Sequence, residues 1–202
     1  TRVLAPSVTW KPNDDTSVTL LLNHTDTDSD TAAQFLPIQG TLYPAPNGRE
    51  IDNDVYLGEP GFNKYNTEAT SVTLLAEHQI NDVWSLEVNS RYTDAESEYN
   101  QAWPWFTGTV ERFVPNPDGS LYKDGKMPRT FYRADKTSDQ AAVDVRFRAD
   151  FATGALKHDL LIGTQYQEVT LDEAGYYLAA FSAPGTPEFQ QYGDRFWINP
   201  FD

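Results

Sequence analysis

Apolar and polar residues alternate along several segments of this chain. In the clearest segment, Ala141, Val143, Val145, Phe147, Ala149 and Phe151 alternate with Gln140, Asp144, Arg146, Arg148 and Asp150. Because successive side chains of a β-strand point to opposite faces, this period of two predicts a strand with one apolar and one charged face. Helical periodicity is scarce, since no apolar stripe with a period of 3.6 residues lasts longer than about two turns.

Five further segments show the same alternation, within residues 4–10, 17–23, 71–80, 84–93 and 159–167. Short sequences rich in turn-forming residues join the six segments in pairs, at 11–15, 81–82 and 152–155. The sequence therefore predicts an all-β fold, an antiparallel up-and-down meander of about six strands. Its hairpins are expected near residues 3–23, 70–97 and 139–170.

The other connections are unusually long and are expected near residues 24–69, 98–138 and 171–202. Ordinary loops have a median length of about 4–6 residues, so a compact soluble domain does not explain these segments. Short turns at one end of the sheet and long loops at the other are typical of outer-membrane barrels. Trp84 and Tyr92 lie about 26 Å apart along an extended strand, which fits aromatic side chains at both membrane interfaces.

Composition narrows the possible classes of protein. The 202 residues contain no Cys, which excludes disulfide scaffolds, thiol nucleophiles and cysteine-based metal sites. No window approaches 18 consecutive apolar residues, so no transmembrane helix is predicted. The formal net charge of −15 disfavours nucleic acid as a partner, because phosphate binding needs clustered Lys and Arg.

Parts of the sequence also fit two kinds of soluble protein and one kind of metal site. A soluble antiparallel sheet also has one apolar face, and loop Trp and Tyr fit a secreted carbohydrate-binding β-module. A β-rich hydrolase using loop carboxylates is less favoured, because no nucleophile elbow, P-loop or zinc-protease motif is present. Asp26–Asp30 begins like a calcium loop, but Thr31 and Pro37 stand where that loop needs Gly and Glu. We therefore expect neither an enzyme nor a resident cofactor or metal.

Several strings of residues resemble TonB-dependent siderophore receptors, most closely the ferrichrome or hydroxamate type. They are Ala5–Pro12, Phe35–Leu42 followed by Pro46–Arg49, Gly58–Asn63, Glu77–Trp84, Phe151–Gly154 with His158 and Leu160 after it, and Asn199–Phe201. Each string is weakly specific alone, but their order and spacing cover nearly the whole chain.

The resemblance implies a 22-stranded outer-membrane barrel whose lumen holds a plug domain. Six strands do not close such a barrel, and nothing in residues 1–202 resembles a plug or an energy-coupling box. The chain is therefore expected to be a barrel segment of a bacterial outer-membrane receptor. That receptor would import a ferric siderophore and draw energy from an inner-membrane coupling protein, which acts through the plug. Outer-membrane lipid is the other expected partner, and an isolated segment is expected to self-associate.

The long loops are dense in aromatic residues, which offer large contact areas and, in Tyr and Trp, a polar group. In ferrichrome-type receptors an aromatic residue that precedes a Leu-Pro pair contacts the siderophore, and Phe35 has that position here. Trp103 and Trp105 follow the fourth strand, where such receptors place further binding aromatics. The expected ligand-binding residues are Phe35, Tyr99, Trp103, Trp105 and Arg112, and loop arginines such as Arg129 and Arg133 are expected to meet anionic groups.

Overall fold

The computed structural model describes residues 1–31, 34–105, 112–179 and 196–202. Its strands are β1 (Arg2–Leu4), β2 (Ser7–Asn13), β3 (Thr16–Thr27), β4 (Lys64–Gln79), β5 (Trp84–Pro104), β6 (Met127–Thr153), β7 (Leu156–Ala179) and β8 (Trp197–Ile198). In this described part the only helix is the 3-10 turn η1 (Tyr122–Gly125). No helix in the same part is long and apolar enough to cross a membrane.

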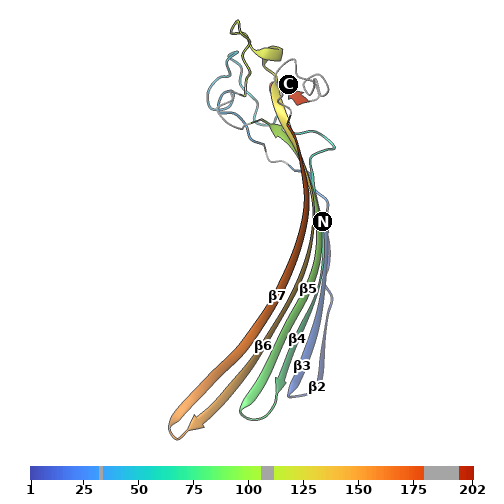
Figure 1. Ribbon diagram of the computed structural model, residues 1–202, viewed down its shortest axis with the longest axis vertical. Coiled ribbons are helices and arrows are strands. Elements are labelled where there is room, and N and C mark those ends of the chain that lie inside the picture. The colour runs from blue at the N-terminus through green and yellow to red at the C-terminus, as the bar shows by residue number, and fades with distance from the viewer. Residues whose placement is uncertain (32–33, 106–111, 180–195) are drawn as a thin grey trace. The chain divides into compact units, whose positions relative to one another are not determined.

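The strands form one sheet in the order β1-β3-β4-β5-β6-β7, in which β2 also pairs with β3 and β8 with β6 (Figure 1). β1 and β2 are two pieces of one edge, and both run antiparallel to β3. The break falls at Pro6, which has no amide hydrogen to donate to the ladder, although its carbonyl accepts from the amide of Leu22 at 3.0 Å. The predicted all-β meander is confirmed.

Three short turns join these strands, at the predicted places. Between β2 and β3, the amide of Asp15 donates to the side chain of Asn13 at 3.1 Å. Between β4 and β5, the Asn81 side chain accepts from the amides of Val83 and Trp84 at 2.9 and 3.0 Å. Between β6 and β7, Gly154 has φ of +63°, a left-handed conformation that costs glycine little.

The strands extend further than the sequence predicted. The hairpins expected at 3–23, 70–97 and 139–170 span residues 2–27, 64–104 and 127–179. The expected loops, which began or ended at 24, 69, 98, 138 and 171, are therefore shorter than predicted. Beyond residue 97 and before residue 139, aromatic and polar residues occupy both faces, and the apolar–polar alternation fades. The backbone ladder continues regardless, because its hydrogen bonds need no particular side chain.

Contacts divide the chain into two units, which we call the sheet unit and the loop unit. The sheet unit comprises residues 1–28, 66–97 and 135–173, and the loop unit comprises residues 29–65, 98–134 and 174–202. Among the described apolar residues of the sheet unit, only Ala149 is fully buried. A single layer of strands has no interior, so its apolar face needs lipid or another surface to cover it.

The two faces of the sheet unit differ as the alternation predicts. Large apolar side chains remain exposed along one face, among them Val8, Trp10, Leu20, Val72, Trp84, Val143, Phe147 and Phe151. On the other face Arg146 binds Asp144 at 2.6 Å, and Arg148 binds Asp159 at 2.6 Å. Asp144, Arg146 and Arg148 share one parity on β6, and Asp159 reaches Arg148 from β7, which supports the assignment of charged side chains to one face.

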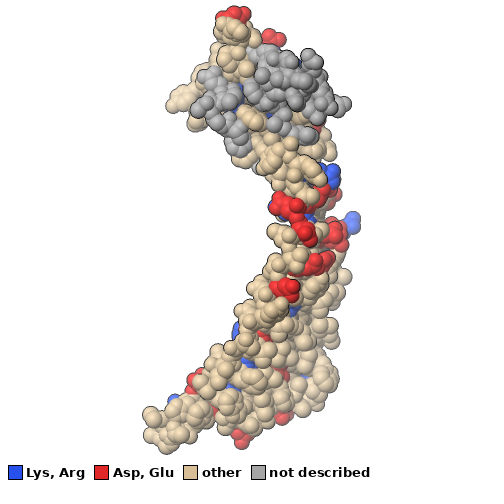
Figure 2. Space-filling model, in the orientation of Figure 1, with Lys and Arg blue, Asp and Glu red and all other residues tan. Residues whose placement is uncertain are grey.

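The ends of the sheet unit also differ. Acidic side chains gather on the viewed face of the strands near the N-terminus (Figure 2). Asp26 lies directly opposite Glu68 in the β3–β4 register, and Arg2 approaches Asp26 at 3.7 Å. This is the end from which the long loops leave, whereas Trp10, Trp84 and Phe151 lie beside the short turns.

The loop unit has an interior of its own. One apolar cluster contains Ala45, Ile51, Leu57, Phe113 and Met127, with Val55, Leu121, Ile198 and Phe201 packed against it. A second contains Phe196 and Trp197, packed against Val114 and Phe131. The members come from residues far apart in sequence, so the long loops fold on one another.

Candidate ligand-binding site

Six aromatic rings of the loop unit form a connected group, which we call the aromatic row: Phe35, Tyr65, Tyr99, Trp103, Tyr132 and Tyr177. Tyr132 is central, because its ring centroid lies 4.4 Å from that of Tyr177, 5.8 Å from Tyr99 and 6.5 Å from Trp103. Tyr99 also contacts Tyr65 at 5.8 Å, and Trp103 contacts Phe35 at 6.1 Å. The spacings and tilted geometries are those of favourable aromatic pairs.

Strand alternation explains how five of these rings come together. Tyr65 is the second residue of β4, and Tyr99 and Trp103 lie four positions apart near the end of β5. Tyr132 lies near the start of β6 and Tyr177 near the end of β7. Residues two or four positions apart share one face of a strand, and neighbouring strands align such residues across the sheet. The rings therefore form a continuous surface across four strands.

The same alternation puts charged groups on the opposite face. The ammonium of Lys64 lies 2.7 Å from the Glu98 carboxylate, and the Arg133 guanidinium lies 3.8 Å from it. Each of these residues directly precedes or follows a ring of the aromatic row: Lys64 precedes Tyr65, Glu98 precedes Tyr99, and Arg133 follows Tyr132. We call Lys64, Glu98 and Arg133 the charged row.

The aromatic row is accessible. Tyr177 is 69% exposed, and Phe35 and Tyr65 are each 45% exposed, whereas Tyr99, Trp103 and Tyr132 are half-buried. Half-buried rings hold their neighbours in place, and the exposed rings offer apolar faces and phenol hydroxyls to a ligand. Such a surface suits a bulky ligand with organic faces and polar groups.

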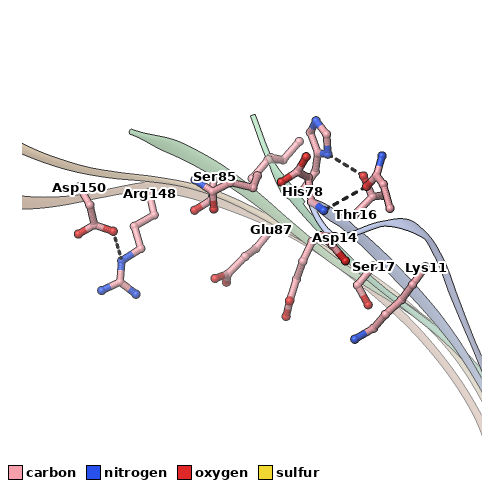
Figure 3. A pocket seen from close by; sticks show the side chains of 14 residues that line it. Lys11, Asp14, Thr16, Ser17, His78, Ser85, Glu87, Arg148 and Asp150 are labelled. Carbon is pink, nitrogen blue, oxygen red and sulfur yellow. Dashed lines mark hydrogen bonds and ion pairs between the residues drawn. The ribbon is translucent and has the colours of Figure 1, made fainter. Parts of the chain in front are cut away.

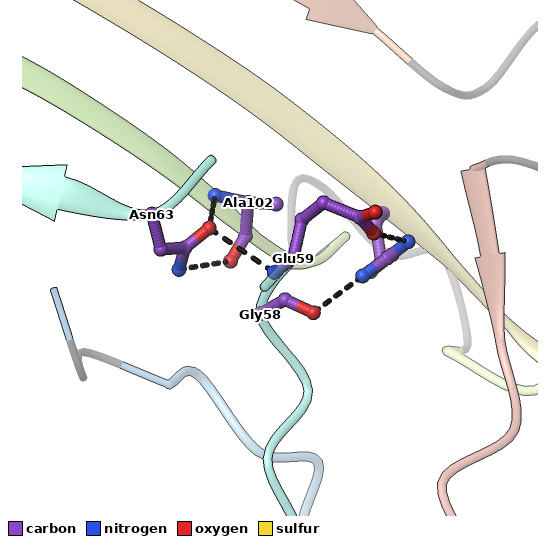
Figure 4. A network of polar contacts seen from close by, with 5 residues as sticks. Gly58, Glu59, Asn63 and Ala102 are labelled. Atoms are coloured by element: carbon purple, nitrogen blue, oxygen red, sulfur yellow. Dashed lines mark hydrogen bonds and ion pairs between the residues drawn. The ribbon is translucent and has the colours of Figure 1, made fainter. Parts of the chain in front are cut away.

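A polar network fixes the segment that precedes β4 (Figure 4). The Asn63 side chain accepts from the Ala102 amide at 2.8 Å and donates to the Ala102 carbonyl at 3.2 Å. Arg129 donates to the Gly58 carbonyl and to the Glu59 carboxylate, each at 2.6 Å. A Cβ added to Gly58 would lie 2.5 Å from the Asn63 side-chain nitrogen, so this close approach requires glycine.

Hydrogen bonds of two residues that precede Phe35 in sequence position it. The Thr31 hydroxyl donates to the Asn100 carbonyl of β5 at 3.1 Å. Gln34 donates to the Val55 carbonyl at 3.1 Å and accepts from the Leu57 amide. The loop that carries Phe35 is thus tied to β5 and to its own later part.

The five predicted ligand residues have different places in the loop unit. Ring contacts bring Phe35, Tyr99 and Trp103 together in the aromatic row. Trp105 follows the end of β5, and its amide donates to the Pro128 carbonyl at 2.8 Å. Arg112 precedes the fully buried Phe113, and burial lowers the pKa of its guanidinium from the ordinary value. Trp105 is thus placed by a backbone hydrogen bond, and Arg112 by its position beside the buried Phe113.

Sequence reasoning missed Tyr65, Tyr132 and Tyr177 as neighbours of the predicted residues. Their signal was present, because each shares the parity of the inward charged positions on its own strand: Tyr132 lies an even number of residues from Arg146, and Tyr177 from Asp159. The predicted strands stop short of these tyrosines, so the alternation was not extended to them. Arg129, expected to meet anionic groups, is 5% exposed and binds Glu59.

A second concave surface lies in the sheet unit, beside the short turns (Figure 3). It encloses about 570 Å³, and its walls include Lys11, Asp14, Ser17, Glu77, Glu87 and Arg148. Arg148 bridges Asp150 at 3.5 Å and Asp159 at 2.6 Å, and the Thr16 hydroxyl lies 2.9 Å from Nδ1 of His78. The lining is strongly polar, which suits contact with water or with a polar protein surface.

Comparison with known proteins agrees with this architecture. Residues 8–198 match the family model described as TonB dependent receptor-like, beta-barrel. The ferrioxamine B receptor of Salmonella typhimurium is 28% identical over 177 residues, which cover 86% of this chain and 23% of that receptor. The ferrichrome outer membrane transporter/phage receptor of Escherichia coli is 24% identical over 178 residues, 84% of this chain and 23% of that protein. The ferrioxamine receptor of Yersinia enterocolitica is 26% identical over 166 residues, 82% and 21% respectively.

The chain thus spans less than a quarter of the length of these relatives. By name they are receptors and transporters, and none is named as an enzyme. The carbohydrate-binding module and the hydrolase weighed from the sequence find no support among them.

Proposed function

This chain belongs to the TonB-dependent receptor-like β-barrel family, and on that premise we propose that it forms part of a receptor that binds and imports a ferric siderophore. Proteins of this family lie in the bacterial outer membrane, so the sheet unit is a segment of an outer-membrane barrel. Its exposed apolar face then meets lipid, and its face of paired charges meets the lumen.

The aromatic row carries the proposal for the ligand. It joins Phe35, the position implied by resemblance, to Trp103 and Tyr99, and it lies among the long loops. Three named relatives bind ferrioxamine or ferrichrome, in which organic chains wrap an iron centre. Organic faces of that kind pack on Phe, Tyr and Trp rings, so the ligand proposed here is a ferric hydroxamate.

The receptor would perform no covalent chemistry and hold no resident cofactor, because the iron complex is its cargo. Import would need a plug in the lumen and an inner-membrane protein that supplies energy. The polar concavity beside the short turns, lined by Glu87 and Arg148, would face that plug. Its charged side chains suit hydrogen bonds and ion pairs with a polar domain surface.

The test is ligand titration of the full-length receptor, with intrinsic fluorescence quenching by ferric hydroxamates as the signal. Phe35→Ala and Trp103→Ala remove rings of the aromatic row, and lost apolar contact of about 1–3 kcal/mol should weaken binding roughly 5- to 150-fold. Trp103 contributes to the fluorescence itself, so its variant is measured by calorimetry as well.

Tyr43→Ala is the matched control, because Tyr43 is a loop aromatic that is 68% exposed and outside the aromatic row. It should bind like the unmodified receptor. Unchanged affinity in both row variants, each correctly folded, would show that these rings serve only the packing of the loops.

A further inference from the structure

On the strands of the loop unit, charged residues lie on one face and uncharged residues on the other. On the side of the aromatic row, the described strand positions are Tyr65, Tyr99, Gln101, Trp103, Pro128, Thr130, Tyr132, Ala134, Gly175 and Tyr177. None of these residues carries a formal charge. The charged residues of the same strand segments, Lys64, Glu98, Arg129 and Arg133, all have the opposite parity.

The basic groups of that opposite face are engaged by carboxylates. Lys64 and Arg133 lie 2.7 and 3.8 Å from Glu98. Arg129 binds Glu59 at 2.6 Å and lies over the Phe131 ring at 5.3 Å. In the described strand segments of the loop unit, no basic residue thus has the parity of the aromatic row. Lys136 of the sheet unit has the parity of Tyr132 on β6, and its ammonium lies 3.1 Å from the Glu173 carboxylate. Basic side chains are the usual means of holding an anionic chelate.

The aromatic row, in contrast, favours a cationic group over an anionic one. The face of an aromatic ring carries negative electrostatic potential and attracts a cation that approaches within about 6 Å of the centroid. Tyr177 and Tyr65 stand at the two ends of the tyrosine series and are 69% and 45% exposed, so their ring faces remain open. The chain's net charge of −15 also attracts cations, and it acts over longer distances than the rings do.

We propose that the aromatic row selects ferric chelates that carry a cationic group, such as a protonated amine, over neutral and anionic chelates. The proposal rests on the proposed function and specifies the charge class of its ligand. Tyr177, with support from Tyr132 behind it, is the ring assigned to the cation.

The experiment uses the full-length receptor and four forms of one iron complex. Ferrioxamine B carries a free amine, its trimethylated form keeps the positive charge, its N-acetyl form is neutral and its N-succinyl form is anionic. The iron centre is the same in all four. We expect both cationic forms to bind about 2- to 30-fold more tightly than the neutral form, and the anionic form to bind most weakly.

Adjacent tyrosines supply the matched variants. Tyr177→Leu should abolish the difference between the cationic and neutral forms, and Tyr177→Phe should keep it, because the ring is preserved. Tyr176 is 63% exposed but points to the other face, so Tyr176→Leu should also keep the difference.

The outcomes separate the two proposals. If none of the four complexes binds, the proposed function is wrong. If all four bind equally, the function stands and the charge selection is wrong. Charge selection by the row is also wrong if the preference persists in Tyr177→Leu and disappears in about 0.5 M salt, because screening of that kind identifies the overall charge as its source.

Discussion

Arg129 should hold the loop before β4 far more strongly than any exposed arginine of the same strand. Arg129→Met removes two hydrogen bonds, to the Gly58 carbonyl and to the Glu59 carboxylate, both 2.6 Å long. The carbonyl loses a buried partner, which costs about 1–3 kcal/mol. Glu59 is 42% exposed and becomes hydrated, so the lost ion pair adds at most about 1 kcal/mol. The methionine chain keeps apolar contact with Phe131, and the expected loss is about 1–4 kcal/mol.

Hydrogen exchange in the full-length receptor measures this loss locally, since the barrel itself does not need to unfold. Amides of residues 58–63 should exchange roughly 5- to 1,000-fold faster in Arg129→Met. Arg133→Met is the control: Arg133 is 53% exposed and lies 3.8 Å from Glu98, so its removal should change exchange less than about fivefold. Equal exchange in the two variants would refute the assignment of Arg129 as the main tie of this loop.

Three further predictions concern the sheet unit. Val145→Arg should cost about 2–4 kcal/mol in refolding titrations into vesicles, because it puts a charge on the lipid face at mid-depth. Arg146→Gln on the other face should cost about 1 kcal/mol or less. Equal tolerance of the two changes would contradict the face assignment. Gly154→Val should cost about 1–2 kcal/mol in the same titration, because φ is +63° there, and Ala155→Val provides the comparison. The 202-residue chain expressed by itself should form oligomers, because among its described residues no strand pairs with the outer edge of β7 and no layer covers the apolar face. A monodisperse monomer in detergent-free light scattering would contradict this.

The strands and their faces were predictable because a period of two is a local property of the sequence. Val143, Val145 and Phe147 alternate with Asp144, Arg146 and Arg148, and no knowledge of distant residues is needed to assign them to two faces. The turns were equally local, since Asn81 and Gly154 act within a few residues of themselves.

The ends of the strands and the full aromatic row were not predictable in this way. Near Tyr99 and Tyr132 a ring stands beside a charged residue, and neither face is simply apolar. The rings meet through pairing of segments that are at least 29 residues apart in sequence, and the loop core depends on contacts such as Arg129 with Gly58. The parity of each ring can be read from its own strand, but which rings meet depends on long-range pairing that follows from the fold.

Alternation also constrains how the coding sequence of these strands can change in length. Lys64 and Tyr65, Glu98 and Tyr99, and Tyr176 and Tyr177 are adjacent pairs whose members face opposite ways. Insertion or loss of one codon ahead of such a pair would exchange the faces of everything after it in the strand. Two codons would restore the original parity. Related genes should therefore differ in even numbers of codons within these strands, whereas the loop at residues 115–121 should tolerate odd and even changes alike.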